Sequence, residues 1–111
     1  MFLGTFSHRH SVLKSQETNR CFTPMQRVLK EDESCNLSIC NSHLSEFGVL
    51  GFEYGYSLAH PNVLVMWEAQ FGDFANGAQI MIDNYIASGE SKWGVQTGVV
   101  LLLPHGMDGQ G

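Results

Sequence analysis

The hydropathy pattern divides the chain into two regions. Residues 1–34 are polar and irregular, and they resemble solvated loops around a short apolar segment. From residue 35 onward, apolar positions recur at regular spacing, which is typical of packed helices and strands. We therefore expect an irregular N-terminal part, residues 1–34, and a regular unit, residues 35–111.

The regular unit alternates short apolar runs with longer periodic segments. Apolar runs of strand length, the last two expected to be buried on both faces, lie at 37–40, 63–67 and 98–103. Helical patterns lie at 45–59, ended by Pro61, and at 71–86, closed by Ser88-Gly89. The order strand, helix, strand, helix, strand predicts an α/β fold, a partial parallel sheet with crossover helices.

Ligands of parallel sheets bind at the carboxyl ends of the strands. The segments that follow the three expected strands are residues 41–46, 68–74 and 105–111. We therefore look for functional residues in these segments first.

Composition and charge narrow the function classes. The chain has 111 residues, 43% of them apolar, which suits one domain with a single core. Residues 1–34 hold five basic and four acidic side chains, but residues 35–111 hold one and seven. Nucleic-acid binding needs clustered basic residues, so we do not expect it. No apolar run approaches the roughly 20 residues that cross a bilayer, so no membrane insertion is expected, and the N-terminus lacks the apolar core of a signal peptide.

Candidate metal ligands are few. Cys21, Cys35 and Cys40 show no Cys-x-x-Cys spacing, which favours reduced thiols over a disulfide framework. His8 and His10 form a His-x-His pair without an evident third ligand. We therefore expect no metal site within this chain.

Glu46 is the first candidate for chemistry. A carboxylate in the first turn of a helix is ordinarily favourable with the helix dipole, by under about 1 kcal/mol. The neighbours of Glu46 are largely apolar, however, and desolvation would raise its pKa and suit it to sharing a proton. Both interpretations remain open at this point.

The aromatic residues after the second strand are the next candidates. Phe71 lies at the turn and is well placed to stack on a flat ring, whereas the spacing of Phe74 favours the core. His105 directly follows the last strand, so it is either a site residue or a loop residue. The glycines at 48, 51 and 55 lie near one helical face, which fits either tight core packing or a subunit interface.

Seven motifs add a resemblance that spacing alone does not give. Two of them are Gly51-Phe-Glu-Tyr-Gly-Tyr56 and Trp67-Glu-Ala-Gln-Phe-Gly-Asp-Phe74. The others lie at 4–10, 44–46, 76–79, 88–93 and 101–106. Together they resemble the thiamine diphosphate-dependent first component of 2-oxoglutarate dehydrogenase, specifically its transketolase-like pyrimidine-binding domain. The similarity covers nearly the whole chain and weakens around residues 11–40.

The resemblance implies roles for particular residues. It assigns Glu46 to the glutamate that hydrogen-bonds N1′ of the cofactor's aminopyrimidine and so favours its imino form. Phe71 is the first choice for the ring-stacking residue and Phe74 the second. His8, His10 and His105 fall near the family's active-site region without an assigned role.

The resemblance also implies a cofactor and partners. The cofactor is thiamine diphosphate, with Mg²⁺ and the diphosphate held by a separate domain whose Gly-Asp-Gly…Asn motif this chain lacks. The expected partners are a second subunit in a homodimer and a lipoyl-bearing succinyltransferase. The expected location is the mitochondrial matrix in a eukaryote and the cytoplasm otherwise.

Two alternatives to this assignment remain open, and one further expectation concerns the activity of the chain by itself. The substrate could be 2-oxoadipate, since that dehydrogenase shares most of these motifs. The incomplete domain is expected to be catalytically inactive in isolation. A stand-alone interaction module that pairs with a full-length homologue is the alternative from a different functional class.

Overall fold

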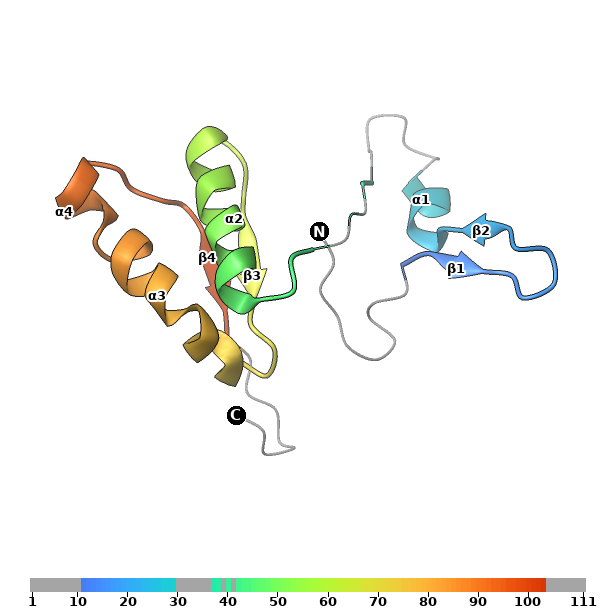
Figure 1. The fold of residues 1–111 in the computed structure, drawn as a ribbon. Helices are drawn as coiled ribbons and strands as arrows, with labels where there is room; N and C mark the ends of the chain where they lie inside the picture. Colours follow the sequence, from blue (N-terminus) through green and yellow to red (C-terminus); the bar gives the residue numbers. More distant parts are fainter. Residues whose placement is uncertain (1–10, 30–36, 39, 41, 104–111) are drawn as a thin grey trace. The chain divides into compact units, whose positions relative to one another are not determined.

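The computed structural model describes residues 11–29, 37–38, 40 and 42–103 (Figure 1). It contains two compact units, Met1–Ser42 and His43–Gly111. The two units are described separately below.

The described part of the first unit holds a small hairpin and a helix. Strands β1 (Leu13–Lys14) and β2 (Cys21–Phe22) pair antiparallel, and α1 (Pro24–Leu29) follows. The backbone N–H of Ser15 donates to the carbonyl of Arg20 at 3.0 Å, which closes the turn. The hydropathy pattern did not predict these elements, because turn bonds and the φ-restricted Pro24 at the helix start produce them locally.

Helix α2 (Glu46–Ala59) confirms the helix expected over 45–59. Ser45 is its N-cap, and the Ser45 hydroxyl accepts a hydrogen bond from the backbone N–H of Gly48 at 3.2 Å. This bond satisfies one of the amide groups that a helix start leaves without a partner. At the other end, His60 N–H donates to Tyr56 O and Pro61 follows, as expected.

Strands β3 (Met66–Glu68) and β4 (Val100–Leu102) form a parallel pair. Both are shorter than the expected runs, and β3 is shifted toward the C-terminus. Along β3 the burial alternates, with Val65, Trp67 and Ala69 buried and Met66 52% exposed. The expectation that 63–67 is buried on both faces is therefore wrong for the described residues. Packing from α2 covers one side of the strand and leaves the other open.

The crossover between β3 and β4 is helical but not one regular helix. It comprises a 3₁₀ turn η2 (Asp73–Ala78), α3 (Gln79–Met81), the π-helix η3 (Ile82–Ile86) and α4 (Gly89–Trp93). The prediction that Ser88-Gly89 closes the helical region is wrong, because Gly89 begins α4. Gly89 is instead a close-approach site, since a Cβ there would lie 3.3 Å from the Tyr54 hydroxyl. The closing residue is Gly94, whose φ of 64° is the left-handed conformation of a helix C-cap.

The core of the second unit lies between the helices and the strand pair. The buried cluster is Val49, Leu50, Trp67, Ala69 and Ala78. Away from this cluster, the hydroxyls of Ser57 and Thr97 lie 2.6 Å apart and join α2 to the segment before β4.

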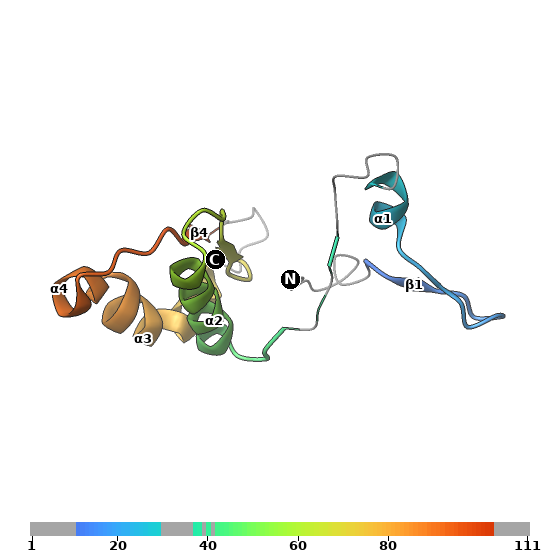
Figure 2. The ribbon, with the colours of Figure 1, turned by 90° about the horizontal axis from the view of Figure 1, so that it is seen from above.

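The observed unit is a helix followed by strand, helical crossover and parallel strand, which is consistent with the predicted α/β class. Figure 2 shows α2 and the crossover side by side. Leu37, Ser38 and Cys40 are not in a strand, contrary to the strand expected at 37–40. Such a short run makes few ladder bonds, and none of the described strands pairs with it.

Candidate functional site

Glu46 occupies the first turn of α2, as the sequence predicts. Its side chain is half-buried, and desolvation by this burial raises the pKa of the Glu46 carboxyl above its ordinary value. Within the described part of the chain, no hydrogen bond or ion pair to the carboxylate offsets this effect. The desolvated interpretation of Glu46 is therefore supported over that of a solvated helix-end charge.

The 3₁₀ turn η2 packs against the start of α2. A Cβ built on Gly77 would lie 3.4 Å from both Cβ and Cγ of Glu46, so Gly77 faces the Glu46 stem. Side chains three residues apart are eclipsed in a 3₁₀ helix. Phe74 therefore lies one turn from Gly77 on the same face of η2.

Phe71 and Phe74 form an aromatic pair beside this face. Their ring centroids lie 6.2 Å apart, and the side chains are 36% and 48% exposed. The expectation that Phe74 belongs to the core is wrong, because the irregular crossover turns the inward stripe toward Ala78 instead. Both rings thus have accessible surface that could cover a planar group.

The turn that carries Phe71 has an unusual backbone. Phe71 has a φ of 56° and the next residue, Gly72, has a φ of 74°. A left-handed conformation is uncommon for a bulky residue, and such strain concentrates at functional sites. The backbone N–H of Gly72 donates to Ala69 O at 3.1 Å, which holds the turn directly after β3.

The three predicted histidines His8, His10 and His105 lie outside the described residues, so the site is built without them. Among residues 11–29, 37–38, 40 and 42–103, no group of three His, Cys, Asp or Glu side chains could hold a metal ion. None of the helices in this part of the chain is long and apolar enough to cross a membrane.

The three glycines of α2 have different surroundings. A Cβ on Gly51 would lie 3.1 Å from Cε of Met81, so close helix packing accounts for this glycine. A Cβ on Gly48 would meet the hydroxyl of its own N-cap, Ser45, at 2.7 Å. Gly55 faces open space and leaves the interface interpretation available at that position.

Glu53 is a buried acid that the sequence analysis did not single out. It is 7% exposed, and desolvation by burial raises the pKa of its carboxyl. Glu53 follows Glu46 by seven residues and Val49 by four, so the three residues lie near one face of the helix. That spacing was the available signal, but an acid on a helix is ordinarily solvent-facing.

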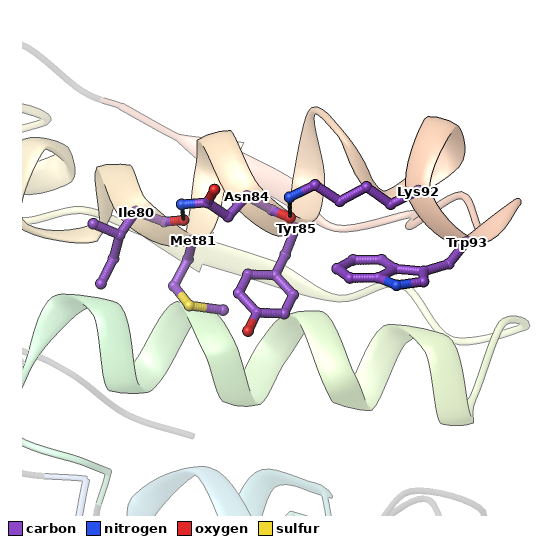
Figure 3. Close-up of a pocket in the computed structure, with 6 residues that line it drawn as sticks. All are labelled: Ile80, Met81, Asn84, Tyr85, Lys92 and Trp93. Carbon is purple, nitrogen blue, oxygen red and sulfur yellow. Dashed lines mark hydrogen bonds between the residues drawn. The ribbon is translucent and has the colours of Figure 1, made fainter.

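A separate hollow of about 430 Å³ lies on the crossover and α4 (Figure 3). Its lining is Ile80, Met81, Asn84, Tyr85, Lys92 and Trp93. The Lys92 ammonium donates to the carbonyl of Asn84 at 2.9 Å and lies 5.4 Å from the Trp93 ring centroid. The hollow contains neither Glu46 nor the Phe71–Phe74 pair, and its single cation already has structural partners.

The geometry at Glu46 suits a specific kind of chemistry. A desolvated carboxyl can share a proton with a ring nitrogen, and adjacent aromatic faces can hold the ring. Gly77 has no side chain to pack on the stem that carries this carboxyl. The arrangement thus matches one end of a flat, protonatable heterocycle.

Comparison with known proteins agrees with this geometry. The family model "Transketolase, pyrimidine binding domain" matches residues 1–111. The chain is 58% identical over 108 residues to the mitochondrial 2-oxoglutarate dehydrogenase of Saccharomyces cerevisiae, covering 97% of this chain and 10% of that protein. It is 56% identical to the 2-oxoglutarate dehydrogenase E1 component of Rickettsia conorii, covering 97% of this chain and 11% of that one. It is also 56% identical to the 2-oxoadipate dehydrogenase complex component E1 of Danio rerio, with 97% and 12% covered. The chain therefore spans about a tenth of the length of these relatives.

Proposed function

Because this chain belongs to the transketolase pyrimidine-binding domain family, we propose that it forms the pyrimidine-binding part of a thiamine diphosphate-dependent 2-oxoglutarate dehydrogenase. The observation that carries the proposal is the half-buried Glu46, whose pKa is raised by desolvation and whose stem faces Gly77. The relatives' names supply the activity that this geometry would serve.

The residues present fit the pyrimidine end of that cofactor. Glu46 offers one proton-sharing carboxyl, and the Phe71–Phe74 pair offers accessible aromatic faces. Mg²⁺ and the diphosphate belong, in this proposal, to another part of the enzyme. Thiamine diphosphate, when bound, supplies the electron sink for decarboxylation of a 2-oxo acid.

In this proposal, the chain orients the pyrimidine ring and shares one proton with it. Glu46 shares a proton with the ring nitrogen through its carboxyl, and desolvation raises the pKa of that carboxyl, which favours its holding the proton. Phe71, with Phe74 beside it, contacts the ring face and limits water access. The 111 residues span about a tenth of the relatives' length, so we expect them to show no turnover by themselves.

The test is Glu46→Gln in a full-length enzyme that carries this chain as its pyrimidine-binding domain. Gln keeps the shape but cannot share a proton, so we expect kcat to fall by about 10²- to 10⁴-fold. Glu90→Gln, the same change on exposed α4, is the matched control and should leave kcat unaltered. Near-normal kcat for Glu46→Gln would contradict the proposal.

The 2-oxo acid, the partners and the location are finer parts of the same proposal. We propose 2-oxoglutarate as substrate, with transfer of the succinyl group to a lipoyl-bearing partner, in a homodimer. The competing substrate is 2-oxoadipate, since one relative bears that name. Comparing kcat/KM for the two acids with the full-length enzyme decides between them. The proposed location is the mitochondrial matrix in a eukaryote and the cytoplasm in a bacterium.

A stand-alone interaction module is the second candidate. It is favoured by an exposed run of rings on α2, in which Phe52 and Tyr56 stack at 6.0 Å and are 48% and 41% exposed. In this case the chain would pair with a full-length homologue through α2. Co-purification of the tagged chain with that homologue, lost on Phe52→Ser, would support it. Absence of the homologue from the purified material would count against it.

A further inference from the structure

We infer that Gly77 is a positioning residue for Glu46, and this inference rests on the proposed function. The inference is based on the close approach of Gly77 in η2 to Glu46 in α2. A Cβ at position 77 would lie 3.4 Å from Cβ and 3.4 Å from Cγ of Glu46. An alanine would therefore touch the Glu46 stem at an ordinary van der Waals distance, and any longer side chain would extend into it.

Backbone conformation does not explain this glycine. Gly72 and Gly94 are the described glycines with positive φ, and Gly77 is not among them. Within a helical segment, glycine costs about 1 kcal/mol relative to alanine. Neither backbone conformation nor helix propensity therefore favours glycine here, and the Glu46 stem borders the place that a side chain at 77 would occupy.

Displacement at this contact would fall on the glutamate side chain. The Glu46 backbone is fixed by the first turn of α2 and by the Ser45 cap. On the other side, η2 is anchored by Ala78, which is fully buried in the core cluster. With both backbones held, a larger residue at 77 would rotate the Glu46 side chain and redirect its carboxyl.

The position of Gly77 also explains why a larger side chain there should affect proton sharing by Glu46. Phe74 precedes Gly77 by three residues and shares its face of η2, and Gly77 borders the Cβ and Cγ atoms that carry the Glu46 carboxyl. A larger side chain at 77 would move the carboxyl and narrow the approach of a planar ring. The consequence is a change in proton sharing and not only a loss of stability.

The experiment is a size series at position 77, Gly77→Ala, Gly77→Ser and Gly77→Val, in the full-length enzyme. We expect kcat to stay within about 2-fold for Ala and to fall by 10-fold or more for Val, since misplacement by about 1 Å can cost on the order of 10²-fold. The pH dependence of kcat should shift progressively along the series. Gly98→Val, the same change where a Cβ meets no atom within 4 Å, is the control and should remain near wild type.

A second measurement tests the contact without the cofactor. Gly77→Val should lower the urea midpoint of the cofactor-free enzyme, and adding Glu46→Ala, which removes Cγ, should restore most of that loss. If Gly77→Val does not fold, the comparison of Ser with Ala decides the size dependence. A flat series, or equal losses with and without the Glu46 side chain, would overturn the inference.

The two proposals fail in different ways. Normal kcat for Glu46→Gln would overturn the proposed function. Low kcat for Glu46→Gln combined with a flat series at 77 would overturn the positioning role alone.

Discussion

Glu46 and Glu53 are two acids on helix α2 that differ in burial. Glu46 is half-buried in the first turn of α2, whereas Glu53 is 7% exposed on the inward side of the same helix. Hydrophobic spacing around Glu46 was sufficient to propose desolvation. The buried state of Glu53 and the left-handed φ of Phe71 depend on contacts across elements and on turn geometry, which residue spacing does not encode.

For Glu53 we predict a pH-dependent effect on stability. Its folded-state pKa is raised above the ordinary 4.5 by desolvation, so protonation favours the folded state. The contribution is fully present below that ordinary value and is lost as pH rises through the raised pKa. Glu53→Gln should therefore raise the free energy of unfolding at pH 7 more than at pH 4, as measured by urea unfolding. Equal changes at both pH values would contradict this.

Trp67 offers a second prediction at this scale. Its indole N–H is buried and has no hydrogen-bond partner among the residues that the structure describes, and an unsatisfied buried donor is costly. Trp67→Phe removes that donor and keeps most of the ring, so we expect a loss below about 2 kcal/mol, against about 3–5 kcal/mol for Trp67→Ala. Chemical denaturation of both variants gives the comparison, and similar losses would argue that the N–H is satisfied.

At the scale of elements, regular periodicity was the reliable signal. Helix α2 matched its prediction because Ser45, the apolar spacing and Pro61 all indicate the same boundaries. The crossover did not match its prediction. The apolar spacing over 71–86 fits one regular α-helix as well as it fits the observed mixture of 3₁₀, α and π segments. The 3₁₀ and π segments arise from packing against α2 and the strands, and Gly89 approaches Tyr54 instead of ending a helix.

The Ser45 cap yields a prediction for α2. Ser45→Ala removes the acceptor for the Gly48 N–H, and loss of such a cap costs about 1 kcal/mol. Ser45→Asp retains an acceptor and should restore most of the stability. Because Glu46 is the next residue, Ser45→Ala should also reduce cofactor affinity, which titration calorimetry on the full-length enzyme would measure. Unchanged stability for Ser45→Ala would mean that the cap is unimportant.

At the scale of the whole molecule, much apolar surface remains uncovered. Leu44, Val28 and Leu64 are among the most exposed apolar side chains, at 104%, 68% and 68%. The chain spans about a tenth of its relatives, and exposed apolar surface of this kind ordinarily marks an interaction surface. The resemblance could indicate the family from the sequence, but the extent of this surface required the structure.

We accordingly predict that the 111-residue chain associates in solution. Sedimentation velocity should show a weight-average coefficient that rises with concentration, because association buries apolar area. Phe52→Lys, placed on the exposed ring run of α2, should reduce the rise more than Lys14→Glu in the first unit. Concentration-independent sedimentation as a monomer would contradict the prediction.

The parallel pairing of β3 with β4 has a consequence during protein synthesis. Met66 pairs with Val100, so a strand that has left the ribosome must wait for 34 further residues before its partner exists. At a synthesis rate of about 5–20 residues per second, the wait is about 2 to 7 s, during which Trp67 and its neighbours have no strand to pair with. The nascent chain is therefore open to chaperone binding over this interval, and its yield should depend on how quickly translation passes through the crossover.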